Sequence, residues 1–273
     1  MSKILILGAS GLIGKALINE LKEDYDIFGT SFSQSLDLCS GKAFKFSVDD
    51  FTRIDNILRE VEPDIVVSAL RGDFDKQLEI HRSVAKYLSE KKGRMIYCST
   101  ANVFDNNVES PHYENDQVDP ESDYGLFKAR CERELAALLG NQVCLARLPL
   151  VWGKDSHRLN EFLKKLMNRE VIEVYDNLFV TNNTDIMVAK QIRHIIEQKV
   201  SGILHLASQD VVNHRDFLAD IADRLGFNDP KFIEVSLEKD KYYLAVLSKE
   251  DVLPDYLRLN NVEIIDYLTD INS

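Results

Sequence analysis

The sequence predicts an α/β protein with a Rossmann-type, doubly wound parallel sheet and a small C-terminal lobe. Three observations support this fold class. A short apolar run at residues 4–7 leads directly into a glycine-rich turn and a helical pattern. Apolar strands and amphipathic helices then alternate through the first half of the chain, which implies right-handed crossovers between parallel strands. From Leu159 onward this alternation weakens, which indicates a separate, smaller unit.

The glycine-rich turn has the spacing G-x-x-G-x-x-G, with a helix expected at 15–21. The first glycine permits a sharp turn, the second lets backbone amides approach a pyrophosphate, and the third lets the helix pack closely on the strand. The helix N-terminus adds unpaired amides and the positive end of a dipole. The turn therefore predicts a dinucleotide site, whose contacts are expected at Gly8, Ser10, Gly11, Leu12, Ile13 and Gly14.

A second strand is expected at 25–30, and the polar turn behind it bears on the choice of cofactor. In this fold an acid at the end of the second strand binds the ribose 2'-hydroxyl of NAD, and its absence admits a 2'-phosphate. No acid occurs here before Asp37, and the turn carries Ser31 and Ser33. NADP(H) is therefore preferred. Because no arginine stands in the turn to bind the phosphate, NAD(H) stays possible.

The remaining elements of the first half are expected as alternating strands and helices at 42–46, 52–61, 65–69, 78–88 and 94–98. Ligands of open α/β sheets bind at the carboxyl ends of the strands. We therefore expect Val48, Ala69 and Leu70 beside the cofactor, with Arg71 close by. Together these elements predict an NAD(P)-binding domain over residues 1–155.

Three polar residues indicate proton chemistry. Thr100 follows the fifth strand, and Tyr124 and Lys128 lie four residues apart at the start of a helix that continues to Leu139. A phenol ordinarily has a pKa near 10, but a neighbouring ammonium stabilises its phenolate. The lysine can also hold the nicotinamide ribose, and the threonine hydroxyl can hydrogen-bond a reacting carbonyl. We expect Thr100, Tyr124 and Lys128 to be catalytic, the last two also touching the cofactor.

With these motifs the chain resembles an extended short-chain dehydrogenase/reductase. It is most similar to the dTDP-4-dehydrorhamnose reductase family of sugar-nucleotide enzymes. Residues 98–105, CSTANVFD, resemble the family's S-T-D-Y-V-F-D segment, and residues 124–128 match its Y-G-x-x-K. Residues 147–153, RLPLVWG, resemble the strand that leads into the family's substrate domain. The resemblance implies the roles expected for Thr100, Tyr124 and Lys128.

Several positions depart from the family pattern. Ala101 replaces the usual Asp after the threonine, Ser47 replaces an Asp after the third strand, and His81 stands where a helix usually carries Asn. The family's C-terminal Arg-Pro segment is not recognisable at 245–253. These departures leave the substrate open. We expect His81 to be a packing or surface residue rather than a catalyst.

The resemblance implies a substrate-binding lobe over 156–273, interleaved with elements that return to the main sheet, and a substrate cleft between the lobes. Elements of this region are expected at 160–167, 171–174, 178–181, 185–198, 203–206 and 214–225. Arg147, Arg158 and His157 are candidates to meet a substrate pyrophosphate, because an arginine fork suits phosphate oxygens. Trp152 is a further substrate-binding candidate, from the strand that leads into the lobe.

Composition limits the remaining possibilities. The net charge of −12 argues against a general nucleic-acid binder. No apolar run is long enough to span a membrane, and the N-terminus is itself strand and loop rather than a signal peptide, so we expect a cytoplasmic location. The scattered cysteines have no metal-ligand spacing and predict reduced thiols and no metal site. A homodimer is possible.

These observations predict an NAD(P)H-dependent oxidoreductase that reduces a keto sugar nucleotide through the triad of Thr100, Tyr124 and Lys128. A 4,6-dehydratase is disfavoured, because that subgroup places Asp-Glu after the threonine and this chain has Ala101-Asn102. Epimerases often carry Ala at that position, so an NAD-dependent sugar-nucleotide epimerase remains open. So does a non-catalytic regulatory subunit that binds the cofactor without turnover.

Overall fold

The computed structural model describes residues 1–36, 38–39, 41–249 and 252–270. A seven-stranded sheet in the order β11-β6-β5-β4-β1-β2-β3 forms its centre, and every strand pair in it is parallel. The strands are β1 (Lys3–Leu7), β2 (Asp26–Ser31), β3 (Ala43–Lys45), β4 (Ile65–Ser68), β5 (Arg94–Thr100), β6 (Val143–Leu148) and β11 (Gly202–His205). The predicted fold class is confirmed.

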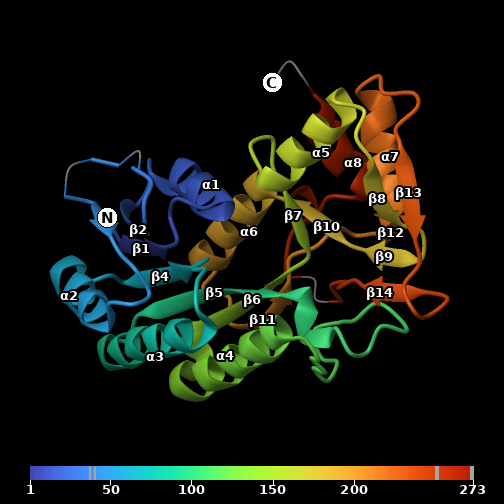
Figure 1. Cartoon of the computed structure of the whole chain (residues 1–273). Helices are drawn as coiled ribbons and strands as arrows, with labels where there is room; N and C mark the ends of the chain where they lie inside the picture. The colour runs from blue at the N-terminus through green and yellow to red at the C-terminus, as the bar shows by residue number, and fades with distance from the viewer. Residues whose placement is uncertain (37, 40, 250–251, 271–273) are drawn as a thin grey trace.

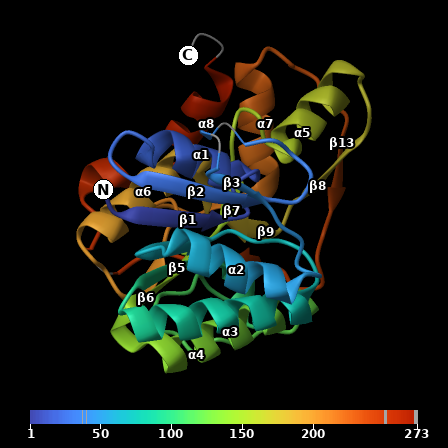
Figure 2. The ribbon, with the colours of Figure 1, turned by 90° about the vertical axis from the view of Figure 1, so that its left-hand side faces the viewer.

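Helices cover both faces of the sheet, as Figure 2 shows. One face is packed by α1 (Leu12–Leu21) and α6 (Asp185–Glu197), and the other by α2 (Phe51–Val61), α3 (Phe74–Lys91) and α4 (Asp123–Leu139). The apolar runs of the strands fit this arrangement, because Leu5 and Leu7 face one helical layer while Ile4 and Ile6 face the other. The two helical layers keep water away from both faces of the sheet, because its strands carry apolar side chains on both faces.

Strand order reverses beside β1, which pairs with β2 on one side and β4 on the other. The connections that leave β1 and β4 therefore run in opposite directions and leave a crevice at the carboxyl ends of the two strands. The glycine turn follows β1 directly, and Ala69 to Arg71 follow β4. The fold thus brings these two segments, far apart in the sequence, to the same edge of the sheet.

The second half builds a lobe above that edge (Figure 1). Its core contains Trp152 and Phe217, whose ring centroids lie 5.3 Å apart. The lobe's helices and strands are β7 (Leu150–Trp152), α5 (His157–Met167), β8 (Ile172–Tyr175), β9 (Leu178–Val180), β10 (Asn182–Thr184), β12 (Val212–Asn213), α7 (His214–Arg224), β13 (Phe232–Val235), β14 (Tyr242–Leu244) and α8 (Asn261–Thr269). Because β11 and α6 return to the main sheet, lobe and sheet are interleaved. The boundary between 155 and 156 stays a prediction.

The expected elements of the first half are all present, with different ends. Helix α3 begins at Phe74 rather than at residue 78, because Asp73 caps it and accepts a hydrogen bond from the Lys76 amide at 3.1 Å. Helix α1 begins at Leu12, directly after Gly11. The strand expected at 147–153 is divided between the end of β6 and β7. Elements without a predicted counterpart are β10, β12, β13, β14 and α8, together with the short 3-10 helices η1 (Ala101–Phe104), η2 (Gly140–Gln142) and η3 (Asp255–Leu257).

The structure also bears on two expectations from the sequence, one about membrane-spanning helices and one about the cysteines. In the described part of the chain, no helix is both long and apolar enough to cross a membrane. The four cysteines are free thiols, with Cys98, Cys131 and Cys144 buried and Cys39 exposed. Burial raises the pKa of the Cys98 thiol to about 11, so this residue packs as a neutral side chain at the edge of the site.

Candidate active site

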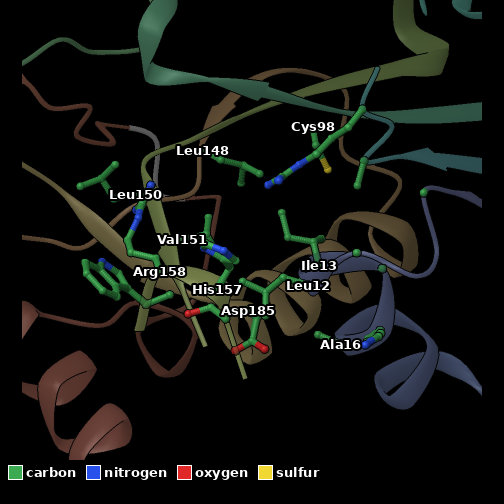
Figure 3. A pocket seen from close by; sticks show the side chains of 18 of the residues that line it. Leu12, Ile13, Ala16, Cys98, Leu148, Leu150, Val151, His157, Arg158 and Asp185 are labelled. Atoms are coloured by element: carbon green, nitrogen blue, oxygen red, sulfur yellow. The ribbon is translucent and has the colours of Figure 1, made fainter. Parts of the chain in front are cut away.

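A cleft of about 2040 Å³ runs between the sheet edge and the lobe. Its walls come from the glycine turn, the ends of β2, β4 and β5, the start of α4, and β7 and α5 of the lobe. Figure 3 shows side chains from both halves around the same space, with Leu12 and Ile13 opposite His157 and Arg158. The volume exceeds what a single small ligand needs and suits two ligands side by side.

The glycine turn fits a dinucleotide in its local geometry. Gly8 has φ of +82°, and a Cβ there would lie 2.6 Å from the Ala69 carbonyl oxygen. A Cβ on Gly14 would lie 2.6 Å from Cα of Ala9, so a side chain would push α1 off the strand. The turn therefore stays tight and the N-terminus of α1 points at the cleft.

Most residues expected at the cofactor line this cleft. Those that do are Gly8, Ser10, Gly11, Leu12, Ile13, Gly14, Ser31, Val48, Ala69, Leu70, Tyr124 and Lys128. Ser33 does not line it, and Phe32 and Gln34 occupy that part of the wall instead. The Ser31 hydroxyl donates to the Gln34 carbonyl oxygen at 2.6 Å, which folds the turn so that Ser33 lies outside. Asp37 lies outside the described residues.

Thr100, Tyr124 and Lys128 come together although the first belongs to β5 and the others to α4. All three residues line the cleft, Thr100 lies near enough to affect the pKa of Tyr124, and Nζ of Lys128 lies 5.8 Å from the centre of the Tyr124 ring. Burial raises the pKa of Tyr124, an effect only partly opposed by Thr100 and the charge of Arg71. The phenol is therefore protonated at neutral pH, the state that a proton donor needs.

Lys128 is held beneath the cleft. Its ammonium donates to the Cys98 carbonyl oxygen at 2.7 Å and lies 4.6 Å from the centre of the Tyr97 ring. Burial lowers the pKa of Lys128 to about 8. The charge of this side chain is consequently retained at neutral pH and lost in mildly alkaline solution.

Asn102, which sequence reasoning used only to disfavour a dehydratase, fixes the threonine. The Thr100 hydroxyl donates to Oδ1 of Asn102 at 3.0 Å, and Nδ2 of Asn102 faces Oδ2 of Asp105 at 3.5 Å. Asp105 also accepts from the Glu121 amide at 2.7 Å, just before α4 begins. These contacts tie the end of β5 to the start of α4, the two elements that carry the triad.

The predicted substrate residues separate into two groups. Trp152 and Arg158 line the cleft, with the Arg158 guanidinium 5.2 Å from the centre of the Trp152 ring. Arg147 is only 2% exposed and does not line the cleft. Its Nη2 donates to Oε2 of Glu132 at 2.8 Å and its guanidinium lies 4.9 Å from the Phe104 ring centre. Arg147 is therefore placed behind the sheet edge and does not enter the substrate site proposed below.

Comparison with known proteins identifies the family. The model of the RmlD substrate binding domain matches residues 2–243. The chain belongs to this family. It is 28% identical over 252 residues to methionine adenosyltransferase 2 subunit beta of Xenopus tropicalis, covering 84% of this chain and 73% of that protein. It is 27% identical over 249 residues to a dTDP-4-dehydrorhamnose reductase of Aggregatibacter actinomycetemcomitans, covering 82% of this chain and 79% of that protein.

Solved structures agree in fold. The dTDP-4-dehydrorhamnose reductase of Bacillus anthracis, determined in complex with NADP, superposes with a TM-score of 0.82 at 18% identity. The match covers 100% of this chain and 99% of that one. The match to the family model confirms the resemblance to the sugar-nucleotide reductase family that the sequence motifs predicted. The solved structures, at this level of identity, show the shared fold alone.

The departures from the family pattern have separate structural settings. Ser47 lines the cleft and donates to Oδ2 of Asp49 at 2.9 Å. Ala101 is buried in η1. His81 is 1% exposed inside α3, where its Nε2 lies 2.8 Å from the Ser68 hydroxyl and its ring meets Tyr97 edge-on at 5.0 Å. His81 is the packing residue that the sequence favoured.

Burial, assisted by the charge of Lys128, lowers the pKa of His81 from 6.5 to about 3. At pH values between about 3 and 6.5, His81 binds a proton in the unfolded chain but not in the folded chain. The free energy of unfolding therefore falls as the pH falls below 6.5. We expect wild type to lose about 2 kcal/mol more stability than His81→Asn between pH 7 and pH 5. Urea unfolding of both proteins at pH 7 and pH 5 measures this difference. The other histidines are the same in both proteins, so their effects cancel. Equal losses would refute the assignment.

Proposed function

We propose that this protein is an NAD(P)H-dependent reductase of a keto sugar nucleotide and that it prefers NADP(H). The observation that carries the proposal is the convergence of Thr100, Tyr124 and Lys128 in the cleft that begins at the glycine turn. At neutral pH Tyr124 is protonated and Lys128 is charged, which supports the roles proposed for them. The division into an NAD(P)-binding domain over 1–155 and a substrate lobe over 156–273 is part of the same proposal.

A bound nicotinamide would supply the hydride that reduces the carbonyl carbon. Tyr124, whose pKa burial raises from an ordinary value that already keeps a phenol protonated at neutral pH, donates its proton to the carbonyl oxygen. Lys128, whose pKa burial lowers to about 8, stabilises the phenolate that this donation leaves. Thr100 would orient the carbonyl oxygen by turning its single hydroxyl proton from Oδ1 of Asn102 to that oxygen, while the Asn102 amide continues to donate to the threonine oxygen.

The lobe supplies the second wall, which carries both cationic and acidic side chains. His157, Arg158 and Lys165 line the cleft together with Asp155, Glu161, Glu173 and Asp185. In this proposal Lys165 binds the diphosphate of the substrate through a local charge-assisted contact rather than through a net positive field. Trp152 is 2% exposed and supports Arg158 from beneath.

The first test is a titration of the purified protein with NADPH and NADH, followed by nicotinamide fluorescence. A panel of 4-keto sugar nucleotides is then added and the absorbance of the reduced cofactor is recorded. Oxidation of NADPH by one panel member supports the reductase. Tight binding without oxidation favours an epimerase or a regulatory subunit, and failure to bind either cofactor contradicts the account of the glycine turn.

Cofactor preference is tested at the end of β2. We expect Ser31→Asp to weaken NADPH binding about tenfold or more and to leave NADH binding unchanged or improved, since a carboxylate repels the 2'-phosphate but accepts from a 2'-hydroxyl. Ser31→Ala controls for the lost hydrogen bond to Gln34. Equal effects of Ser31→Asp on both cofactors would place the adenosine ribose elsewhere.

A second candidate is a cofactor-binding regulatory subunit without turnover. The observation in its favour is the 28% identity to methionine adenosyltransferase 2 subunit beta, which covers 84% of this chain. Both candidates bind the cofactor through the same turn, so cofactor binding alone does not separate them. The Tyr124 substitution in the Discussion does.

A further inference from the structure

We propose that Arg71 and Arg158 form an anion site across the cleft, which recognises a carboxylate on the sugar ring of the substrate. This inference rests on the proposed function, because it names a substrate class for the same cleft: keto sugar nucleotides whose sugar is a uronic acid.

The two arginines come from opposite walls. Arg71 follows β4 at the sheet edge, and Arg158 lies in the first turn of α5 in the lobe. Arg158 rests on the Trp152 ring at 5.2 Å, and the indole is fixed in turn by donating from Nε1 to Oδ1 of Asn182 at 2.8 Å. The lobe therefore presents the Arg158 guanidinium on a rigid platform that faces the Rossmann half.

Arg71 and Arg158 differ from other arginines of the chain in their ion-pair partners. The chain has 45 acidic residues against 33 lysines and arginines. In the described part of the chain, neither Arg71 nor Arg158 has a carboxylate within ion-pair distance, whereas other arginines do. Arg71 and Arg158 line the same cleft from its two halves, and besides burial the positive charge of Arg71 lowers the pKa of Arg158. An anion between them would relieve this repulsion and accept hydrogen bonds from both forks.

The position of Arg71 selects among possible anions. Its charge acts on both Tyr124 and Lys128, and three residues later the Phe74 ring lies 5.9 Å from the Tyr124 ring. The Arg71 segment is thus at the reacting end of the cleft. A group bound there belongs beside the carbonyl on the sugar ring, where a uronic acid carries its carboxylate.

The diphosphate has a separate partner further along the lobe. Lys165 lines the cleft two turns beyond Arg158 on α5, about 10 Å away along the helix axis. The two cationic positions are far enough apart to meet the two anionic groups of one uronic-acid sugar nucleotide. Arg71 then binds the carboxylate of the sugar, while Lys165 binds the diphosphate, which all sugar nucleotides share.

The single tryptophan, Trp152, provides a binding signal inside the cleft. We titrate the full chain, saturated with NADP⁺, with UDP-glucuronate, UDP-glucose and UDP, and follow tryptophan fluorescence. UDP-glucuronate is expected to bind about 10- to 100-fold more tightly than UDP-glucose, as for a charge-assisted hydrogen-bonded pair. Arg71→Gln is expected to remove this difference and leave UDP-glucose binding within about twofold.

Two further variants test whether the preference for UDP-glucuronate depends on the charge of Arg71, on its planar guanidinium group, or on binding of the diphosphate. Arg71→Lys keeps the charge but not the planar fork, so part of the preference for UDP-glucuronate should remain. Lys165→Gln removes a charge from the same cleft and should weaken all three ligands by similar factors. If Arg71→Gln also weakens all three equally, the anion at Arg71 is the diphosphate and the carboxylate site is wrong.

Equal affinity of the wild-type protein for UDP-glucuronate and UDP-glucose, or no binding of either, would also overturn the proposal. Because the signal is binding and not turnover, its failure is distinct from failure of the reductase. A preference for UDP-glucuronate without NADPH oxidation by any 4-keto sugar nucleotide would leave the anion site standing and remove the proposed reaction.

Discussion

Tyr124→Phe is expected to lower the rate of NADPH oxidation by roughly 10²- to 10⁴-fold, because the variant lacks the proton donor of the reaction. The ring remains in place against Phe74, whose ring centroid lies 5.9 Å away, and the cleft keeps its shape. NADPH affinity should therefore stay within about twofold of wild type. Steady-state kinetics with the substrate found by the panel, together with the fluorescence titration, measure both quantities.

Tyr113→Phe is the matched control, since Tyr113 is also a tyrosine but lies outside the cleft, with its ring beneath the Lys249 ammonium at 3.9 Å. It should keep full turnover. If Tyr124→Phe also turns over normally, the phenol is not the proton donor. If neither wild type nor variant oxidises NADPH while both bind it, the regulatory subunit becomes the better account.

Glu132→Ala is expected to lower the free energy of unfolding by about 3–5 kcal/mol. Glu132 accepts from Arg147 at 2.8 Å and from the Ser99 hydroxyl at 2.5 Å, and both charged side chains are nearly inaccessible, at 6% and 2% exposure. Removing the carboxylate leaves the Arg147 charge buried with no compensating anion. Urea unfolding followed by circular dichroism measures the loss.

Two further variants test the physical reason. Glu134→Ala, on the same helix, breaks the ion pairs with Arg82 and Arg130 near the surface and should cost less than about 1 kcal/mol per pair. The double variant Glu132→Met with Arg147→Met should regain most of the loss, because it removes both charges and keeps the volume. A loss as small for Glu132→Ala as for Glu134→Ala would mean that water reaches the pair.

The buried Glu132–Arg147 pair also explains why Arg147, which the sequence suggested as a substrate ligand, does not face the cleft. Arg147 at a strand end has the appearance of a phosphate ligand in the sequence, since its partner is 15 residues away on another element. Only when α4 packs on β5 and β6 does Glu132 meet it. Arg158 carried the same expectation and does reach the cleft, so the sequence did not distinguish a structural arginine from one that faces a ligand.

The features that could be predicted before the structure are those that depend on a few neighbouring residues. The apolar run before Gly8 specifies β1, the glycine spacing specifies the turn, and the i, i+4 spacing places Tyr124 and Lys128 on one face of a helix. These features need only a few consecutive residues, so pattern and spacing suffice. The parallel sheet follows from their alternation.

Which distant side chains meet depends on tertiary packing. Whether His81 is buried against Ser68, whether Ser33 or Gln34 faces the cleft, and whether Arg71 and Arg158 line one cleft depend on how loops and layers pack. The short lobe strand β10 also depends on pairing across the chain, with β7, rather than on its own residues. Burial and electrostatics act through space, and distance along the sequence does not encode them.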